Sequence, residues 1–204
     1  MPRPPRELKP GGIYHVTARG NRKQRIFLAD DDRRFFLTLL DRIAARLRWI
    51  CHAYCLMENH YHLVVETPGA DLSTGLQLLN GRYAQTFNAR YSLTGHLFQG
   101  RFHSVVVRTD EHLFELTRYL ALNPVRAGLC ARPEQWPWSS YRAVIGATPE
   151  PPFLKVDRLL EFFGAHPVVR RERLHRFVHD ARPIPLEDLA VRAMAGVRPR
   201  TGPL

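Results

Sequence analysis

Two histidines, His60 and His62, stand two residues apart in the segment MENHYHLVVETP. Because side chains at positions i and i+2 of a β-strand point to the same side, the two imidazoles are predicted to stand next to each other, with Tyr61 on the opposite side. This arrangement suits a shared metal ion, and it also occurs by chance on a polar strand face. The pair alone therefore leaves a metal site and a hydrogen-bonded or solvated pair both open.

A tyrosine and an asparagine, Tyr119 and Asn123, lie four positions apart in the segment ELTRYLALNPVRAGL. On a helix this spacing places them on one side, beside the apolar stripe that contains Leu116, where the helix meets its packing partner. If that partner is the strand face with the two histidines, four functional groups converge. A tyrosine can act as a covalent nucleophile, and a metal can polarise a phosphoryl oxygen. The alternative is an ordinary tyrosine and an asparagine that caps the helix before Pro124.

The apolar patterns predict the elements that must position these residues. The expected order is β-α-β-β-α-β followed by a helix that Pro124 ends after Leu122. This order predicts an α+β fold, a ferredoxin-like antiparallel sheet with an added catalytic helix and a helical C-terminal extension. The expected strands and helices are residues 13–20, 49–57, 60–67 and 103–108, and residues 30–47, 72–91 and 109–122, respectively.

Composition shifts suggest how the chain is divided. Residues 1–12 are rich in Pro, Gly and Arg and are predicted to form a flexible N-terminus. Residues 13–146 are predicted to form the catalytic domain, and residues 147–204 a Pro-rich hinge with a basic helical extension. This extension could pack over the catalytic domain or touch a polyanion, and its sequence leaves both open.

The charge balance favours a polyanionic partner. Lys and Arg number 30 against 19 Asp and Glu, a formal net charge of +11 that comes mainly from arginine. Arginine is well suited to gripping phosphates and stacking on bases, so nucleic acid is the favoured partner. A basic surface that merely reflects arginine-rich codon use is the alternative.

The number of cysteines and the hydropathy of the chain indicate where in the cell the protein is located. The chain has three cysteines, an odd number that implies no disulfide framework and fits a reducing cytosol. Cys51, His52 and Cys55 could suggest half of a zinc site, but no second pair stands at the required spacing, so structural burial of the cysteines is favoured. The chain has no signal-peptide pattern and no apolar run of membrane-spanning length. We therefore expect a cytoplasmic protein with no membrane partner.

Several segments together resemble a known family. The segments YHVTARGN, ENHYHLVVETP, LNGRYAQTFN, GHLFQGRF and RYLALNPVRAGL, in this order, resemble the single-tyrosine HUH (IS200-like) transposases, and in particular the REP-associated tyrosine transposases. The resemblance covers roughly residues 12–142. It implies that Tyr119 is the nucleophile and that His60 and His62 are metal ligands. Asn123 matches the third ligand, which is usually glutamine in the insertion-sequence relatives. Glu58 stands where many relatives have proline or aspartate.

The resemblance also implies an activity. It implies a metal-dependent endonuclease and transposase that cleaves and rejoins single-stranded DNA near repeat-palindrome hairpins through a 5′-phosphotyrosine intermediate. The implied cofactor is Mg²⁺ or Mn²⁺. Insertion-sequence relatives are dimers, whereas the repeat-associated branch can act as monomers, and the long C-terminal tail favours a monomer here.

Hairpin recognition requires phosphate contacts for position and base contacts for sequence. The candidates are basic or amide residues near the end of the first strand, on the long helix, in the FQGRF loop and after Asn123. For each of them singly, a solvated side chain is the alternative. These candidates are Arg19, Asn21, Arg22, Arg82, Gln99, Arg101 and Arg126.

Other functions are possible for such a chain. A hairpin-binding module related to RNA-recognition domains shares the fold, and GRFHSVVV weakly matches its aromatic strand motif. Such a module gives no role to His60, His62, Tyr119 and Asn123. A structural zinc protein would need a fourth ligand of the usual kind. A domesticated transposase that processes hairpins without moving its own gene would have the same active site.

Overall fold

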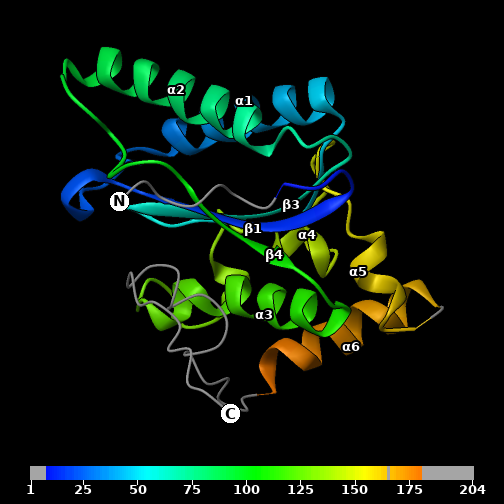
Figure 1. Cartoon of the computed structure of the whole chain (residues 1–204). Helices are drawn as coiled ribbons and strands as arrows, with labels where there is room; N and C mark the ends of the chain where they lie inside the picture. The colour runs from blue at the N-terminus through cyan, green and yellow to red at the C-terminus, as the bar shows by residue number, and fades with distance from the viewer. Residues whose placement is uncertain (1–7, 165, 181–204) are drawn as a thin grey trace, which may run out of the picture.

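The computed structural model describes residues 8–164 and 166–180, and its strands and helices alternate in the predicted order (Figure 1). The strands are β1 (Gly12–Arg19), β2 (Ile50–Leu56), β3 (His60–Thr67) and β4 (His103–Val107). The helices of the predicted core are α1 (Asp30–Leu47), α2 (Leu72–Tyr91) and α3 (Asp110–Arg126). Short elements follow, namely α4 (Tyr141–Val144), α5 (Asp157–Glu161) and α6 (Pro167–His179), and two 3-10 turns, η1 (Asn21–Lys23) and η2 (Pro133–Gln135).

The strands form one sheet in the order β2-β3-β1-β4, and every neighbouring pair is antiparallel. Helices α1 and α2 cover one face, and α3 crosses the other face (Figure 1). Tyr61 lies on the face under α1 and α2, where its ring is 4.7 Å from the ring of Phe36 and its hydroxyl donates to Asn80 Oδ1 at 2.7 Å. The predicted α+β fold with a β-α-β-β-α-β sheet and an added helix is therefore confirmed.

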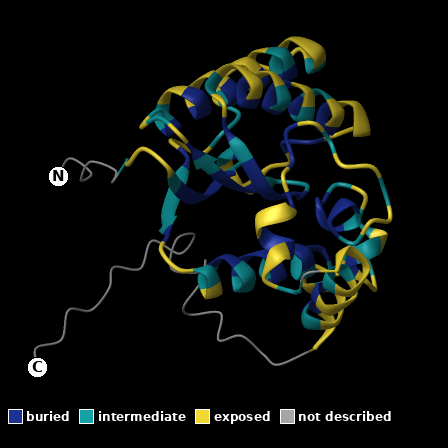
Figure 2. Ribbon diagram, turned by 90° about the vertical axis from the view of Figure 1, so that its right-hand side faces the viewer, coloured by how far each residue is buried: buried dark blue, intermediate teal, exposed yellow. Residues whose placement is uncertain are grey.

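The sheet is covered on both faces, so its central strands are buried almost throughout (Figure 2). A strand of this kind carries apolar residues on both faces rather than in strict alternation. Polar side chains on such strands are rare and need partners. His15 and His62 are such side chains, because 1% and 0% of their surfaces, respectively, are exposed.

One buried carboxylate joins the start of α1 to the end of α2. Asp32 accepts hydrogen bonds from the backbone amides of Leu28 and Ala29 at 2.9 Å each, which anchors the entry into the helix. It also accepts from the Arg90 guanidinium at 2.6 Å and from the Tyr91 hydroxyl at 2.8 Å. These contacts hold together the two helices on the outer face of the sheet.

The prediction that Pro124 ends the third helix after Leu122 is wrong. Helix α3 continues to Arg126 with Pro124 inside it. A proline removes only one backbone donor, and Pro124 is buried in the last turn, where packing offsets that loss. Asn123 consequently keeps helical geometry and stays on the same side of α3 as Tyr119.

Part of the C-terminal extension packs on α3. Leu174 and Val178 of α6 are buried, and the Arg118 guanidinium of α3 lies 4.7 Å from the centre of the Phe177 ring. The division at residue 147 stays a prediction, and residues 1–7 and 181–204 of the predicted termini lie outside the described residues. Within the described part of the chain, no helix is long and apolar enough to cross a membrane.

Candidate active site

The two histidines stand side by side at the start of β3. Their ring centres are 4.9 Å apart and the rings are nearly perpendicular, at 82°. The antiparallel pairing places Thr17 of β1 opposite His62 and Arg19 opposite His60. His62 is buried and His60 is half-buried, so His62 lies in the core and His60 lies nearer the surface.

Helix α3 brings Tyr119 and Asn123 to the same place. The amide nitrogen Nδ2 of Asn123 lies 2.8 Å from Nε2 of His62. The Tyr119 ring meets the His62 ring edge to face, with centres 5.6 Å apart. The structure therefore brings together the four residues that the sequence singled out. The alternative that Asn123 is a helix cap is wrong, because the cap residue of α3 is Ala127.

The structure adds a fifth residue, His15, which the sequence analysis missed. Its Nε2 lies 3.0 Å from Nδ1 of His62, and the two rings stack at 13° with centres 5.2 Å apart. On the other histidine, Nδ1 of His60 lies 2.7 Å from the side-chain oxygen of Asn59. Both histidines of β3 thus have a protein partner at Nδ1, so Nε2 is the nitrogen available for ligation, and that of His62 already contacts Asn123.

Burial keeps these imidazoles neutral. Burial is the main cause that lowers the pKa of His60 to about 4, with Arg19 as a second cause. Burial likewise lowers the pKa of His15 to about 3 and holds the pKa of His62 well below its ordinary value. At neutral pH each ring is therefore uncharged and keeps one unprotonated nitrogen, the form in which histidine binds metals.

Tyr119 lies under a positive charge. Burial raises the pKa of its hydroxyl, and the nearby Arg126 guanidinium opposes this rise. The centre of that guanidinium lies 5.5 Å from the centre of the Tyr119 ring. A cation in this position favours the ionised phenolate, the form of tyrosine that attacks phosphorus.

The predicted DNA contacts fall into separate groups. Asn21, Gln99 and Arg101 line a hollow of about 820 Å³ between α2 and the loop that contains FQGRF. Arg19 and Arg126 lie beside the four-residue cluster instead. The remaining two candidates do not line the hollow: Arg82 is exposed on α2 and Arg22 is exposed in η1.

The hollow is attached to the end of β1 next to the histidines. The backbone amide of Gln99 donates to the carbonyl of Arg19 at 2.9 Å, and that of Asn21 donates to the carbonyl of Leu97 at 2.8 Å. Gly20 forms the bridge to Phe98 between these two bonds, and it also allows the tight turn that follows, because a Cβ atom there would collide with the carbonyl oxygen of Gln24. One short stretch of backbone thus connects the hollow to the strand position opposite His60.

The cysteines do not form a metal site in the described structure. Cys51 and Cys55 are fully buried in β2, and burial raises the pKa of both thiols, that of Cys51 to about 12. The predicted structural burial of these two cysteines is therefore confirmed.

The comparisons with known proteins agree with this geometry. A family model described as "Transposase IS200 like" matches residues 10–123, more than half of the chain. A Haemophilus influenzae protein assigned by name to the REP-associated tyrosine transposases is 24% identical over 161 residues, covering 70% of this chain and 86% of that protein.

A solved structure of a REP-associated tyrosine transposase bound to a REP hairpin aligns with a TM-score of 0.61. The alignment covers 82% of this chain and 93% of the other, at 19% sequence identity, so it supports a shared fold. The resemblance to this branch that the sequence segments indicated is thus found again in both a curated relative and a solved structure. With the family model matched over all four strands and most of α3, the chain belongs to the IS200-like transposase family.

Proposed function

We propose that this transposase cleaves and rejoins single-stranded DNA next to a hairpin, with Tyr119 as the nucleophile. One observation carries the proposal, namely that Tyr119 and Asn123 of α3 contact His62 of β3, whose ring stands next to that of His60. The hairpin as substrate is supported by the related transposase whose structure holds a REP hairpin.

The proposed reaction is a reversible exchange of phosphodiester bonds. The phenolate oxygen of Tyr119 attacks phosphorus, and the bond between phosphorus and the 3′-oxygen breaks. The 5′-phosphate stays attached to the tyrosine, and the departing 3′-oxygen takes up a proton. A 3′-hydroxyl of the same or another strand then attacks the phosphotyrosine, which restores the phosphodiester and frees Tyr119.

The donor atoms fit a divalent ion such as Mg²⁺ or Mn²⁺. His60 and His62 offer neutral Nε2 atoms, and the amide of Asn123 beside His62 offers an oxygen after a half-turn about its last bond. This mixed nitrogen and oxygen set is intermediate between hard and soft. When bound there, such an ion would polarise the phosphoryl oxygen. His15 holds the ring of His62 in place through Nδ1 of His62, and Asn59 does the same for His60 through Nδ1 of His60.

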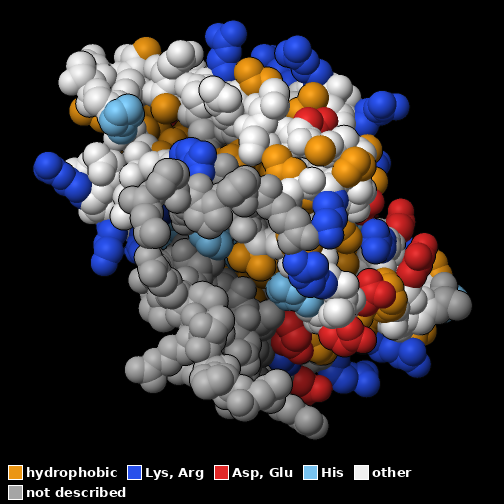
Figure 3. Space-filling model, viewed as in Figure 1, with side chains coloured by type: hydrophobic (Ala, Val, Ile, Leu, Met, Phe, Trp, Pro, Cys, Tyr) orange, Lys and Arg blue, Asp and Glu red, His pale blue; other side chains and the backbone are white. Residues whose placement is uncertain are grey.

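The distribution of surface charge supports the proposal that DNA binds on the side of the molecule where the hollow lies. On the face shown in Figure 3, Asp and Glu side chains gather toward α5 and α6, whereas the charged side chains near α1 and α2 are mainly Lys and Arg. The hollow between α2 and the FQGRF loop combines an arginine with amide groups, Asn21, Gln99 and Arg101 among them. An unpaired base beside the hairpin would find both a phosphate contact and hydrogen-bonding groups there.

A binding module without chemistry is less well supported. RNA-recognition domains bind bases on an open face of the sheet. Here α1 and α2 cover one face and α3 covers the other (Figure 1). In addition, a module of this kind would give no function to the contact between Asn123 and His62.

The test is a search for the covalent intermediate. The protein is incubated with single-stranded hairpin DNA from the flanks of its own gene, with Mn²⁺ or Mg²⁺, and run on a denaturing protein gel. We expect a DNA-linked band with the wild type and none with Tyr119→Phe. Tyr91→Phe is the matched control, because it removes a tyrosine hydroxyl that contacts Asp32 on the face of the sheet opposite to α3.

Histidine variants separate binding from chemistry. We expect His60→Ala and His62→Ala each to abolish metal-dependent cleavage and to leave hairpin binding mostly intact, because charge and shape drive binding. The proposal fails if wild type binds hairpins yet gives no covalent band with either metal. Equal loss of binding in both histidine variants would instead point to a structural role for the pair.

A further inference from the structure

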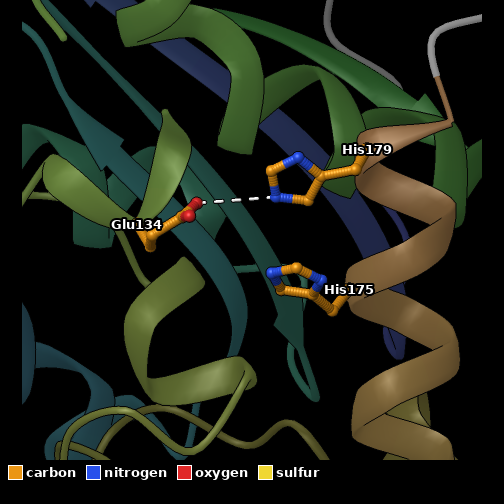
Figure 4. A group of neighbouring side chains, drawn as sticks. All are labelled: Glu134, His175 and His179. Atoms are coloured by element: carbon orange, nitrogen blue, oxygen red, sulfur yellow. Dashed lines mark ion pairs between the residues drawn. The ribbon is translucent and has the colours of Figure 1, made fainter. Parts of the chain in front are cut away.

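A second group of side chains that could hold a metal ion lies outside the cluster around His62. Glu134 belongs to η2, and His175 and His179 stand four residues apart on α6, so that they share one side of that helix. Figure 4 shows both imidazoles directed toward the carboxylate. One ligand atom from each residue lies within 4.8 Å of the other two. No step of the proposed DNA reaction uses these residues.

We propose that Glu134, His175 and His179 form a zinc site that fastens α6 to the catalytic domain. Two histidines at helical spacing and a carboxylate from another element are a common donor set for Zn²⁺, with water as the fourth ligand. The site is independent of the proposed nuclease activity, which requires the separate cluster around His62.

The distance between the acid and one histidine fits an ion better than a direct bond. Nε2 of His179 lies 3.5 Å from Oε2 of Glu134, beyond the usual range for a hydrogen bond between nitrogen and oxygen. Two ligand atoms at about 2.1 Å from a tetrahedral ion are about 3.4 Å apart. These two atoms therefore already have the separation that a shared zinc ion requires, and the ligand atom of His175 lies within 4.8 Å of both.

The carboxylate has an unused oxygen at this place. Oε2 of Glu134 is buried and makes no hydrogen bond, whereas Oε1 lies 3.6 Å from Nε of Arg132. His179 is its ion-pair neighbour at 3.5 Å, but a buried carboxylate oxygen that makes no hydrogen bond is still unfavourable, and a cation between the two groups would satisfy it. The side chains remain partly open to solvent, 25% for Glu134 and 35% for His179, so an ion can enter.

The site would complete the attachment of α6. The first half of α6 is already fastened, because the Arg171 guanidinium donates to the carbonyl of Ala143 at 2.8 Å and to Oε1 of Glu150 at 2.8 Å. Near its end, Phe177 packs under Arg118 of α3, the residue before Tyr119. Zinc between η2 and α6 would hold this end of α6 against the helix that carries the nucleophile.

Zinc binding is the direct test. The full chain, freed of any affinity tag and stripped with a chelator, is titrated with Zn²⁺ against a chromophoric competitor. We expect the variant His175→Gln/His179→Gln to bind one equivalent fewer than wild type, or to bind it at least tenfold more weakly. His166→Gln is the matched control, since this exposed histidine precedes the same helix, and it should bind as wild type does.

Two further variants make the outcome unambiguous. His60→Ala/His62→Ala should keep the zinc equivalent assigned to Glu134, His175 and His179, because it alters only the active site. Glu134→Gln, which preserves shape, should weaken binding as the double histidine variant does. Zinc should also raise the melting temperature of wild type and of His166→Gln, and not that of His175→Gln/His179→Gln. If His175→Gln/His179→Gln binds zinc with the stoichiometry and affinity of wild type, the site does not exist.

Discussion

His15 and His62 form a buried pair of imidazoles in which Nε2 of one lies 3.0 Å from Nδ1 of the other. Their positions follow from the sheet, because Thr17 pairs with His62 and His15 is therefore its diagonal neighbour on the same face. The amide of Asn123 lies at the opposite nitrogen of His62. If that amide donates to Nε2, then Nδ1 of His62 carries the proton and donates it to His15. His15 thus sets which nitrogen of His62 is available to the site.

The first prediction is that His15 determines metal affinity. His15→Leu removes the acceptor for Nδ1 of His62, and loss of such a supporting contact weakens metal binding by about 10- to 100-fold. We expect the Mn²⁺ concentration for half-maximal cleavage to rise by this factor, with a smaller change in the rate at saturating Mn²⁺. His15→Gln, which keeps an acceptor, should restore part of the affinity. His52→Leu serves as the control, because His52 pairs with Glu66 instead. An unchanged Mn²⁺ dependence in His15→Leu would remove His15 from the site.

The second prediction ranks two residues of α3. Tyr119→Phe should reduce cleavage to the uncatalysed level, since no other group in the cluster replaces the nucleophile. Asn123→Ala should slow cleavage less, because water can take the place of one ligand oxygen. Single-turnover rates with excess protein measure both effects without interference from product release. If Asn123→Ala is the slower variant, Tyr119 is not the nucleophile.

The strand pattern of the sequence was enough to predict the fold and to place His60 and His62 on one side of a strand. The four-residue spacing of Tyr119 and Asn123 was equally informative, because it predicted that they share one side of a helix. Both predictions, for the strand and for the helix, depend on local periodicity alone. Which helix covers which face is a long-range property, and the sequence supported it only through the family resemblance.

Three features escaped sequence analysis for physical reasons. His15 lies in an alternating strand like many others, and only the pairing of β1 with β3 reveals that it meets His62. Pro124 was expected to end its helix from local preference, but burial in the last turn of α3 overrides that preference. The group of Glu134, His175 and His179 joins residues about 40 positions apart in the chain, a separation at which spacing carries no information.

The third prediction concerns the ionisation of Tyr119. Arg126 holds down a pKa that burial raises, so removal of its charge leaves the phenol harder to ionise. In Arg126→Ala the rising limb of the cleavage rate against pH should therefore move to higher pH, and Arg126→Lys should move it partly back. Hairpin affinity at fixed pH is measured alongside. A uniform loss of affinity with an unshifted pH profile would mean that Arg126 holds a phosphate and does not activate the tyrosine.

The fourth prediction tests the carboxylate that joins α1 and α2. Asp32 is 2% exposed and accepts from two backbone amides, Arg90 and Tyr91, so Asp32→Ala leaves several donors without a partner. Loss of a buried, hydrogen-bonded charge costs about 3 kcal/mol, and we expect a loss of this size in the free energy of unfolding, measured by urea titration. Asp31→Ala is the matched control one position away, where an exposed pair with Arg34 contributes little. Equal stability of the two variants would show that the buried network does not hold the two helices together, and that the apolar contact between them is sufficient.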